Sequence, residues 1–162
     1  RIIAKMNSLL EPEIITALYE ASQAGVKIEL IVRGVCALRP GVKNLSENIS
    51  VRSVIGRFLE HTRIFYFRNN GANDIYLSSA DWMDRNFFRR IEVCFPVLDK
   101  KLKKRVLDEG LNIYLHDNHQ AWIMDSAGHY QLNTTRRGSP KCAQLLLLQE
   151  LSNLPLKEPE AG

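Results

Sequence analysis

The chain has 162 residues, 25% of them charged, and a net charge of +4, and it is long enough for one domain with a buried core. No apolar run approaches the roughly 20 residues of a membrane span, and no signal-peptide pattern opens the sequence. Three widely spaced cysteines without a CxxC pair disfavour a disulfide framework and a zinc site. We therefore expect a cytoplasmic protein, with association to a membrane surface as an alternative. Because a strand pattern follows directly on Arg1, we also expect a piece of a longer protein.

The beginning of the chain predicts a βαβ unit. The patterns indicate a strand at Ile2–Met6, a helix at Pro12–Ala24 and a strand at Val26–Val32. Such short connections favour a crossover in which the two strands are parallel. Ligands of parallel sheets gather beyond the carboxyl ends of the strands, and Lys5, Asn7 and Arg33 lie there.

A β-hairpin is predicted in the middle of the chain. Its arms are Arg63–Phe67 and Asp74–Ser78, and its turn is Asn69–Asn73. Closing this hairpin brings His61 and Arg63 close to Ser79 and Asp81, which gathers an imidazole, a guanidinium, two hydroxyls (Ser78 and Ser79) and a carboxylate at one sheet edge. The simplest structural alternative is that Arg63 and Asp81 form an ion pair across the hairpin.

The remaining elements are predicted from the same signals. They are a strand at Ile49–Ile55, a helical turn at Trp82–Asn86, a strand at Arg89–Val97, a helix from the N-cap Asp99 to about His116, a small hairpin of Gln120–Met124 and Tyr130–Asn133, a last helix at Pro140–Asn153, and a loose tail at 156–162. On the strand Arg89–Val97, Arg90 and Glu92 are two residues apart and are expected on the same face.

Two sets of motifs carry a resemblance to known families. The pattern His61-x-Arg63 followed by Ser78-Ser79-x-Asp81 resembles the phospholipase D signature, with arginine in the lysine place, aspartate in the asparagine place, and one copy instead of two. The segments KMNSLLEPEIITALYEASQAGVKIELIVRG, RFLEHTRIF, LSSADWMDRN and RRIEV closely resemble the C-terminal part of bacterial polyphosphate kinase of the phosphohistidine type. The resemblance implies an α/β fold, a phospholipase-D-like mixed sheet flanked by helices, as a single domain over residues 1–155.

The resemblance also implies a function. The full enzyme transfers the γ-phosphate of ATP reversibly to polyphosphate through a phosphohistidine in the preceding domain. In this chain, Arg33 of IVRG contacts ATP phosphates, His61 of LEH is catalytic and lies in the ATP site, and Arg90 and Glu92 of RRIEV line the same site. From its place at the carboxyl end of the first strand, Lys5 is predicted as a further phosphate contact. Mg²⁺ is bound mainly by residues outside this chain, which holds no metal site of its own and is inactive in isolation.

The partners implied by this reading are ATP or ADP, inorganic polyphosphate and the preceding domains of the same chain, in a full-length protein that forms homo-oligomers and binds no specific nucleic acid. Two rivals remain open. One is a phospholipase-D-like phosphodiesterase or nuclease half-domain, which the arginine and aspartate departures disfavour. The other is a non-catalytic basic module that binds nucleic acid through counterion release.

Overall fold

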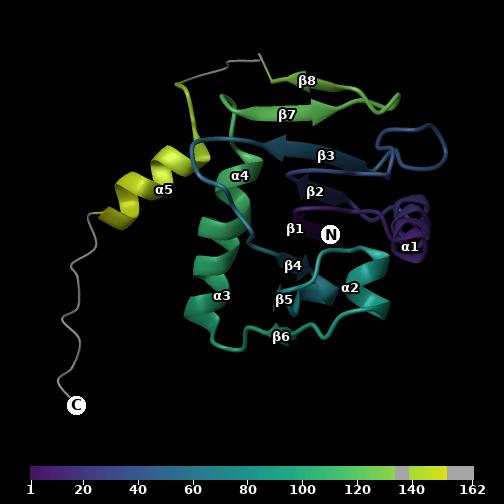
Figure 1. Ribbon diagram of the computed structural model, residues 1–162, viewed down its shortest axis with the longest axis horizontal. Helices are drawn as coiled ribbons and strands as arrows, with labels where there is room; N and C mark the ends of the chain where they lie inside the picture. The colour runs from purple at the N-terminus through teal and green to yellow at the C-terminus, as the bar shows by residue number, and fades with distance from the viewer. Residues whose placement is uncertain (134–138, 153–162) are drawn as a thin grey trace.

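The computed structural model describes residues 1–133 and 139–152, and its centre is an eight-stranded mixed sheet in the order β6-β5-β4-β1-β2-β3-β7-β8 (Figure 1). The strands are β1 Ile2–Met6, β2 Ile28–Val32, β3 Ile49–Val54, β4 Ile64–Phe67, β5 Asp74–Ser78, β6 Cys94–Pro96, β7 Ala121–Met124 and β8 Tyr130–Leu132. The helices are α1 Pro12–Gln23, α2 Asp84–Phe88, α3 Lys100–Leu107, a π-helical turn Asp108–Asn112, α4 Ile113–Leu115 and α5 Ala143–Ser152, with a 3₁₀ turn at Asn69–Gly71. The expected α/β fold, a mixed sheet flanked by helices, is confirmed.

Helices cover both faces of the sheet, and the alternation of apolar residues along the central strands explains why. Ala4 and Leu30 belong to the core cluster that includes Leu18 of α1, whereas Ile3 and Ile31 belong to the cluster that packs against α3 and α4. Figure 1 shows α1 and the α3–α4 helix at opposite sides of the sheet. Because strand side chains alternate between faces, Lys5 follows Ile3 onto the α3–α4 face.

The predicted βαβ unit and central hairpin are confirmed. β1 and β2 are parallel, with Lys5 opposite Ile31, and β4 and β5 are antiparallel. β1 also pairs antiparallel with β4, which brings the open end of the hairpin to the carboxyl ends of β1 and β2. The small hairpin of β7 and β8 also forms as predicted.

The strand predicted at Arg89–Val97 is wrong over most of its length. Only Cys94–Pro96 pairs with β5, because β5 ends at Ser78 and the hydroxyl of Ser79 already accepts the N–H of Val93 at 3.0 Å. The side chains of residues 89–93 do not pack alternately against a core, and Ile91 is fully exposed. Arg90 and Glu92 therefore lie in an irregular segment after α2, not side by side on a strand.

The helix predicted from Asp99 is confirmed, with one departure. Asp99 caps α3 by accepting the N–H groups of Lys101 and Leu102, both at 2.9 Å, and helical structure continues to Leu115 through the π-helical turn, which the sequence pattern did not indicate. The last helix starts at Ala143, three residues later than predicted. Its predicted end at Asn153 and the tail 156–162 lie outside the described residues. None of the described helices is long and apolar enough to cross a membrane.

Candidate active site

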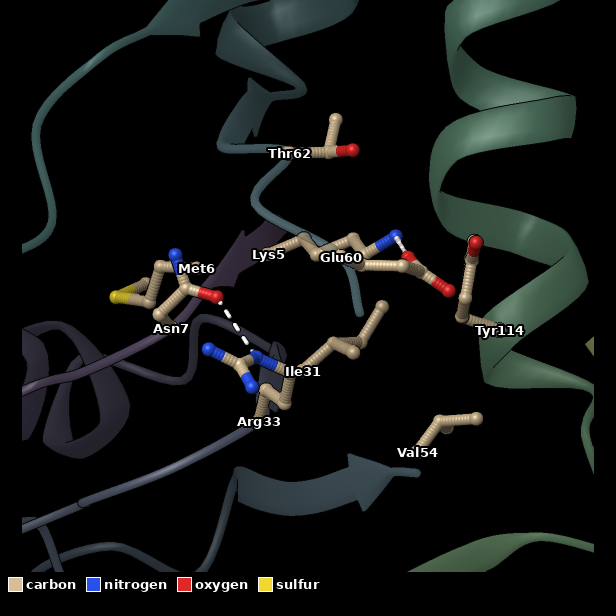
Figure 2. A pocket seen from close by; sticks show the side chains of 9 residues that line it. All are labelled: Lys5, Met6, Asn7, Ile31, Arg33, Val54, Glu60, Thr62 and Tyr114. Atoms are coloured by element: carbon tan, nitrogen blue, oxygen red, sulfur yellow. Dashed lines mark hydrogen bonds and ion pairs between the residues drawn. The ribbon is translucent and has the colours of Figure 1, made fainter. Parts of the chain in front are cut away.

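Three residues singled out by the parallel-strand rule line one small cavity. Lys5 and Asn7 come from the end of β1 and Arg33 follows β2, and Glu60, Thr62 and Tyr114 close the space from the β3–β4 loop and α4 (Figure 2). The cavity measures about 10 Å³, which is room for about one water molecule. A larger ligand can therefore be contacted only at its mouth.

Arg33 carries the uncompensated charge of this cavity. Its Nε donates to Oδ1 of Asn7 at 2.9 Å (Figure 2), and the residue is half-buried. Among residues 1–133 and 139–152, no carboxylate forms an ion pair with its guanidinium. A planar guanidinium held by a neutral amide keeps its charge and its remaining N–H donors for an anion.

Lys5 is in the opposite situation, because its ammonium is already satisfied inside the fold. Its Nζ lies 2.5 Å from Oε2 of Glu60 and 3.3 Å from the centroid of the Tyr114 ring, and the residue is only 6% exposed. Burial lowers the pKa of Lys5 despite the neighbouring carboxylate. Burial raises the pKa of Glu60, but the Lys5 charge and hydrogen bonds from Lys5, Gln144 and Tyr114 outweigh it, so the net pKa is lowered.

The predicted ion pair across the hairpin is confirmed. Arg63 Nη2 lies 3.0 Å from Oδ2 of Asp81, and its Nε donates to Oδ1 at 3.1 Å. Oδ1 of Asp81 also accepts the backbone N–H groups of Asn7 at 2.7 Å and Ser8 at 3.3 Å. Asp81 therefore fixes the backbone of the residue whose side chain holds Arg33.

His61 lies in the irregular loop 55–63 between β3 and β4 and is exposed to solvent. Nη1 of Arg63 donates to its carbonyl oxygen at 2.8 Å. Its neighbours in the chain, Glu60 and Thr62, line the cavity that contains Arg33. His61 itself is not among the residues that line this cavity.

Arg90 and Glu92 line a second, larger cavity of about 530 Å³, whose other walls include the rings of Phe65, Tyr76 and Trp82. Glu92 accepts a hydrogen bond from Nδ2 of Asn86 at 2.5 Å and another from the hydroxyl of Ser79. The hydrogen bonds from Ser79 and Asn86 lower the pKa of Glu92.

Four predicted site residues are thus divided between two cavities near the Arg63–Asp81 pair: Lys5 and Arg33 line the smaller one and Arg90 and Glu92 the larger one, whereas His61 lines neither. Asn7, whose backbone N–H Asp81 accepts, lines the smaller cavity, and Ala80 and Trp82, the neighbours of Asp81 in the chain, line the larger one.

Sequence reasoning missed two residues that contact this region. Glu60 belongs to the LEH segment but received no role, and Gln144 lies in the first turn of α5, where it contacts the loop that carries His61. As an acidic residue in the LEH segment, Glu60 could have been predicted as an ion-pair partner for Lys5 at the end of β1. No local signal points to Gln144, because it lies 84 residues further along the chain than Glu60. Within the described ranges, no group of three or more His, Cys, Asp or Glu residues gathers as a metal site.

Comparison with known proteins identifies the family. The family model "Polyphosphate kinase C-terminal domain 2" matches residues 1–144. The polyphosphate kinase of Burkholderia lata is 70% identical over 131 residues, or 81% of this chain and 19% of that protein. That of Burkholderia cenocepacia is 66% identical over 148 residues, or 91% of this chain and 21% of that protein.

Solved structures agree with this assignment. The crystal structure of polyphosphate kinase from Porphyromonas gingivalis matches with a TM-score of 0.88 and 42% identity over 93% of this chain and 23% of that one. NucT from Helicobacter pylori matches with a TM-score of 0.51 and 14% identity over 66% of this chain and 74% of that one, a likeness of fold alone. The chain spans about a fifth of the length of the curated relatives it matches, and it belongs to the polyphosphate kinase family, where it corresponds to C-terminal domain 2.

Proposed function

We propose that this chain is part of a polyphosphate kinase that reversibly transfers the γ-phosphate of ATP to polyphosphate through a phosphohistidine located in the preceding domain. The observation that supports this most is the half-buried, uncompensated guanidinium of Arg33 at the carboxyl ends of two parallel strands. In phosphoryl transfer the protein contributes mainly positioning and electrostatic stabilisation of the phosphate oxygens. A cation held by a neutral amide suits that task.

We assign different roles to the residues near the two cavities. Arg33 binds phosphate oxygens at the mouth of the smaller cavity. His61, an exposed residue between two that line this cavity, donates or accepts a proton during transfer. Arg90 and Glu92 border the nucleotide from the second cavity, whose 530 Å³ falls in the usual size range of small-molecule sites. Lys5, predicted above as a phosphate contact, lines the same cavity, but its ammonium is already paired with Glu60, so we propose that it supports this region without binding phosphate itself.

Other parts of the active site are proposed to lie outside this chain. Mg²⁺ would accompany the nucleotide and neutralise phosphate charge, held mainly by residues of other domains. The phosphate-accepting histidine would belong to the preceding domain, so the isolated chain, residues 1–155 acting as one domain, is expected to be inactive alone. We further propose a cytoplasmic, homo-oligomeric full-length protein, with membrane-surface association as an alternative, and no specific nucleic-acid partner.

Substitution of Arg33 tests this function in the full-length protein. We expect Arg33→Ala to lower kcat/KM for polyphosphate synthesis from ATP by about 10- to 100-fold, because charge-assisted hydrogen bonds contribute about 1.5–3 kcal/mol each. Arg33→Lys should recover only part of the loss, since an ammonium lacks the planar fork.

The matched control is Arg68→Ala, which removes an exposed arginine just beyond the other end of β4 and should leave synthesis within about twofold of wild type. Unchanged kinetics for Arg33→Ala would contradict the proposed phosphate contact. Release of product from a phosphodiester, without synthesis of polyphosphate, would instead support the phosphodiesterase reading.

A further inference from the structure

The loop that carries His61 has no secondary structure of its own. Residues 55–62 run between β3 and β4 without ladder hydrogen bonds, and the loop leaves Ile55, Phe58 and Leu59 exposed. Such a segment is mobile unless something outside it fixes its backbone. A residue that moves protons must stay within hydrogen-bond reach of its target, so the contacts that fix this loop bear directly on His61.

Gln144 supplies three of these contacts from the first turn of α5. Its Oε1 accepts the backbone N–H of Phe58 at 2.9 Å, and its Nε2 donates to the carbonyl of Phe58 at 2.8 Å and to Oε1 of Glu60 at 2.7 Å. The side chain thus pairs with one loop residue as a β-strand would and reaches a second one immediately before His61. Gln144 is only 5% exposed, so water cannot readily replace these bonds.

The absence of a side chain at Gly56 leaves room for the amide of Gln144. A Cβ at Gly56 would lie 2.3 Å from Oε1 of Gln144, so any larger residue would displace the amide. The start of α5 is fixed in turn by Asp117, whose Oδ2 accepts the N–H of Ala143 at 2.8 Å and whose Oδ1 accepts the N–H of Ala121 at the start of β7. Gln144 is therefore anchored to the sheet independently of the loop.

Glu60 links Gln144 to the centre of the sheet. One carboxylate oxygen accepts from Gln144 and the other from Lys5 of β1, at 2.7 and 2.5 Å. Lys5 is buried between this carboxylate and the Tyr114 ring. The contacts run from β1 through Lys5 and Glu60 to Gln144 and α5, and Figure 2 shows the first of them.

We propose that Lys5, Glu60 and Gln144, the loop clamp, position His61 for phosphoryl transfer, and that Lys5 acts through Glu60 instead of touching the transferred phosphate. The inference rests on the proposed function and deepens it, because it assigns the three residues as positioning residues of the same site. It also predicts which kinetic constant each substitution changes.

The test uses the full-length protein and two backgrounds. Gln144→Ala in otherwise wild-type enzyme should lower kcat about 10- to 100-fold, since a misplacement near 1 Å can cost that much, with KM for ATP changed less than about twofold. In a His61→Ala background the same substitution should have almost no further effect, because the clamp acts through a side chain that is already absent. Additive losses in the two backgrounds would overturn the inference, because a merely structural role damages both equally.

Lys5 is tested by a charge-compensated pair. Lys5→Met leaves the half-buried Glu60 carboxylate without its cation and should lower kcat, whereas Lys5→Met combined with Glu60→Gln removes both charges, keeps the contact with Gln144 and should recover much of the loss. A direct phosphate ligand would behave differently: KM for ATP or polyphosphate would rise, and removing Glu60 would restore nothing. That result would overturn the role given to Lys5.

Folding and function are separated by controls. Gln149→Ala changes an exposed residue of the same type on the same helix and should match wild type in activity and thermal midpoint. If Gln144→Ala fails to fold, Glu60→Gln is isosteric and must show the same non-additivity with His61→Ala for the inference to stand. If Arg33→Ala and His61→Ala leave synthesis unchanged, the proposed function fails; if both abolish it while the Gln144 effects are additive, only the clamp fails.

Discussion

Replacing His61 by alanine in the full-length protein is expected to lower kcat for polyphosphate synthesis by about 10²- to 10⁴-fold, the usual contribution of a positioned acid or base. His61 is exposed, its neighbours in the chain line the cavity that contains Arg33, and the loop that carries it is held by Gln144 and Glu60. The substitution changes an exposed side chain and removes no backbone contact, since the carbonyl that accepts from Arg63 remains. The thermal midpoint should therefore stay within about 2 °C of wild type, because surface substitutions usually change stability by less than about 0.5 kcal/mol.

Two further variants define what His61 does. His61→Gln keeps a hydrogen-bonding group but cannot exchange a proton, so it should be as slow as His61→Ala if the residue is an acid or base. Recovery of most activity in His61→Gln would make it a phosphate ligand instead. His129→Ala removes another exposed imidazole, in the turn between β7 and β8, and should have no effect. Near-wild-type synthesis by both His61 variants would refute a catalytic role.

The parts of the site that the sequence predicts correctly depend on regular structure. Lys5, Asn7 and Arg33 share a cavity because two parallel strands joined by a helix must end at the same edge. Arg63 and Asp81 pair because they flank the open end of a hairpin whose turn fixes its register. In both cases a local pattern determines the pairing of backbones, and the pairing determines which side chains meet.

The parts that the sequence does not predict depend on irregular segments and distant contacts. Arg90 and Glu92 follow α2 in a segment with no ladder partner, so a period of two carries no information about where they point. Gln144 contacts Phe58, which lies 86 residues earlier in the chain. It does so from a helix whose first N–H is accepted by the carboxylate of Asp117. The sequence pattern cannot show that the Lys5 ammonium is paired with a carboxylate inside the fold, because this pairing depends on the loop that brings Glu60 over β1.

Replacing Asp81 by alanine is expected to lower the free energy of unfolding of the 162-residue chain by about 3 kcal/mol, near the lower end of the range for breaking a buried ion pair. The Asp81 side chain is 5% exposed and that of Arg63 is 19% exposed, so water can partly solvate the guanidinium that is left behind. The backbone N–H groups of Asn7 and Ser8 lose their acceptor as well, and an unsatisfied buried donor carries its own cost. Urea unfolding at pH 7 measures the difference.

Comparison variants separate the charge from the hydrogen bonds. Asp81→Asn keeps an oxygen that can accept from Asn7 and should be less destabilising than Asp81→Ala. Asp84→Ala breaks the exposed pair with Arg89, which spans 3.3 Å, and should cost less than about 1 kcal/mol. Equal losses for Asp81→Ala and Asp84→Ala would contradict the structural importance of the hairpin pair.

The pH dependence follows from the direction of the Asp81 pKa. Burial raises it, but the hydrogen bond and charge of Arg63 and the N–H groups of Asn7 and Ser8 outweigh burial, so the pKa in the folded chain lies below the ordinary value of 3.8. The stability that Asp81 contributes is therefore fully present above about pH 4 and is lost as the pH falls through the folded value. The gap between wild type and Asp81→Asn should be largest at neutral pH and should shrink at pH 3, because protonated aspartate resembles asparagine. Since Asp81 also holds the backbone of Asn7, whose side chain holds Arg33, Asp81→Asn in the full-length protein should weaken phosphate binding less than Asp81→Ala, in the same order as stability.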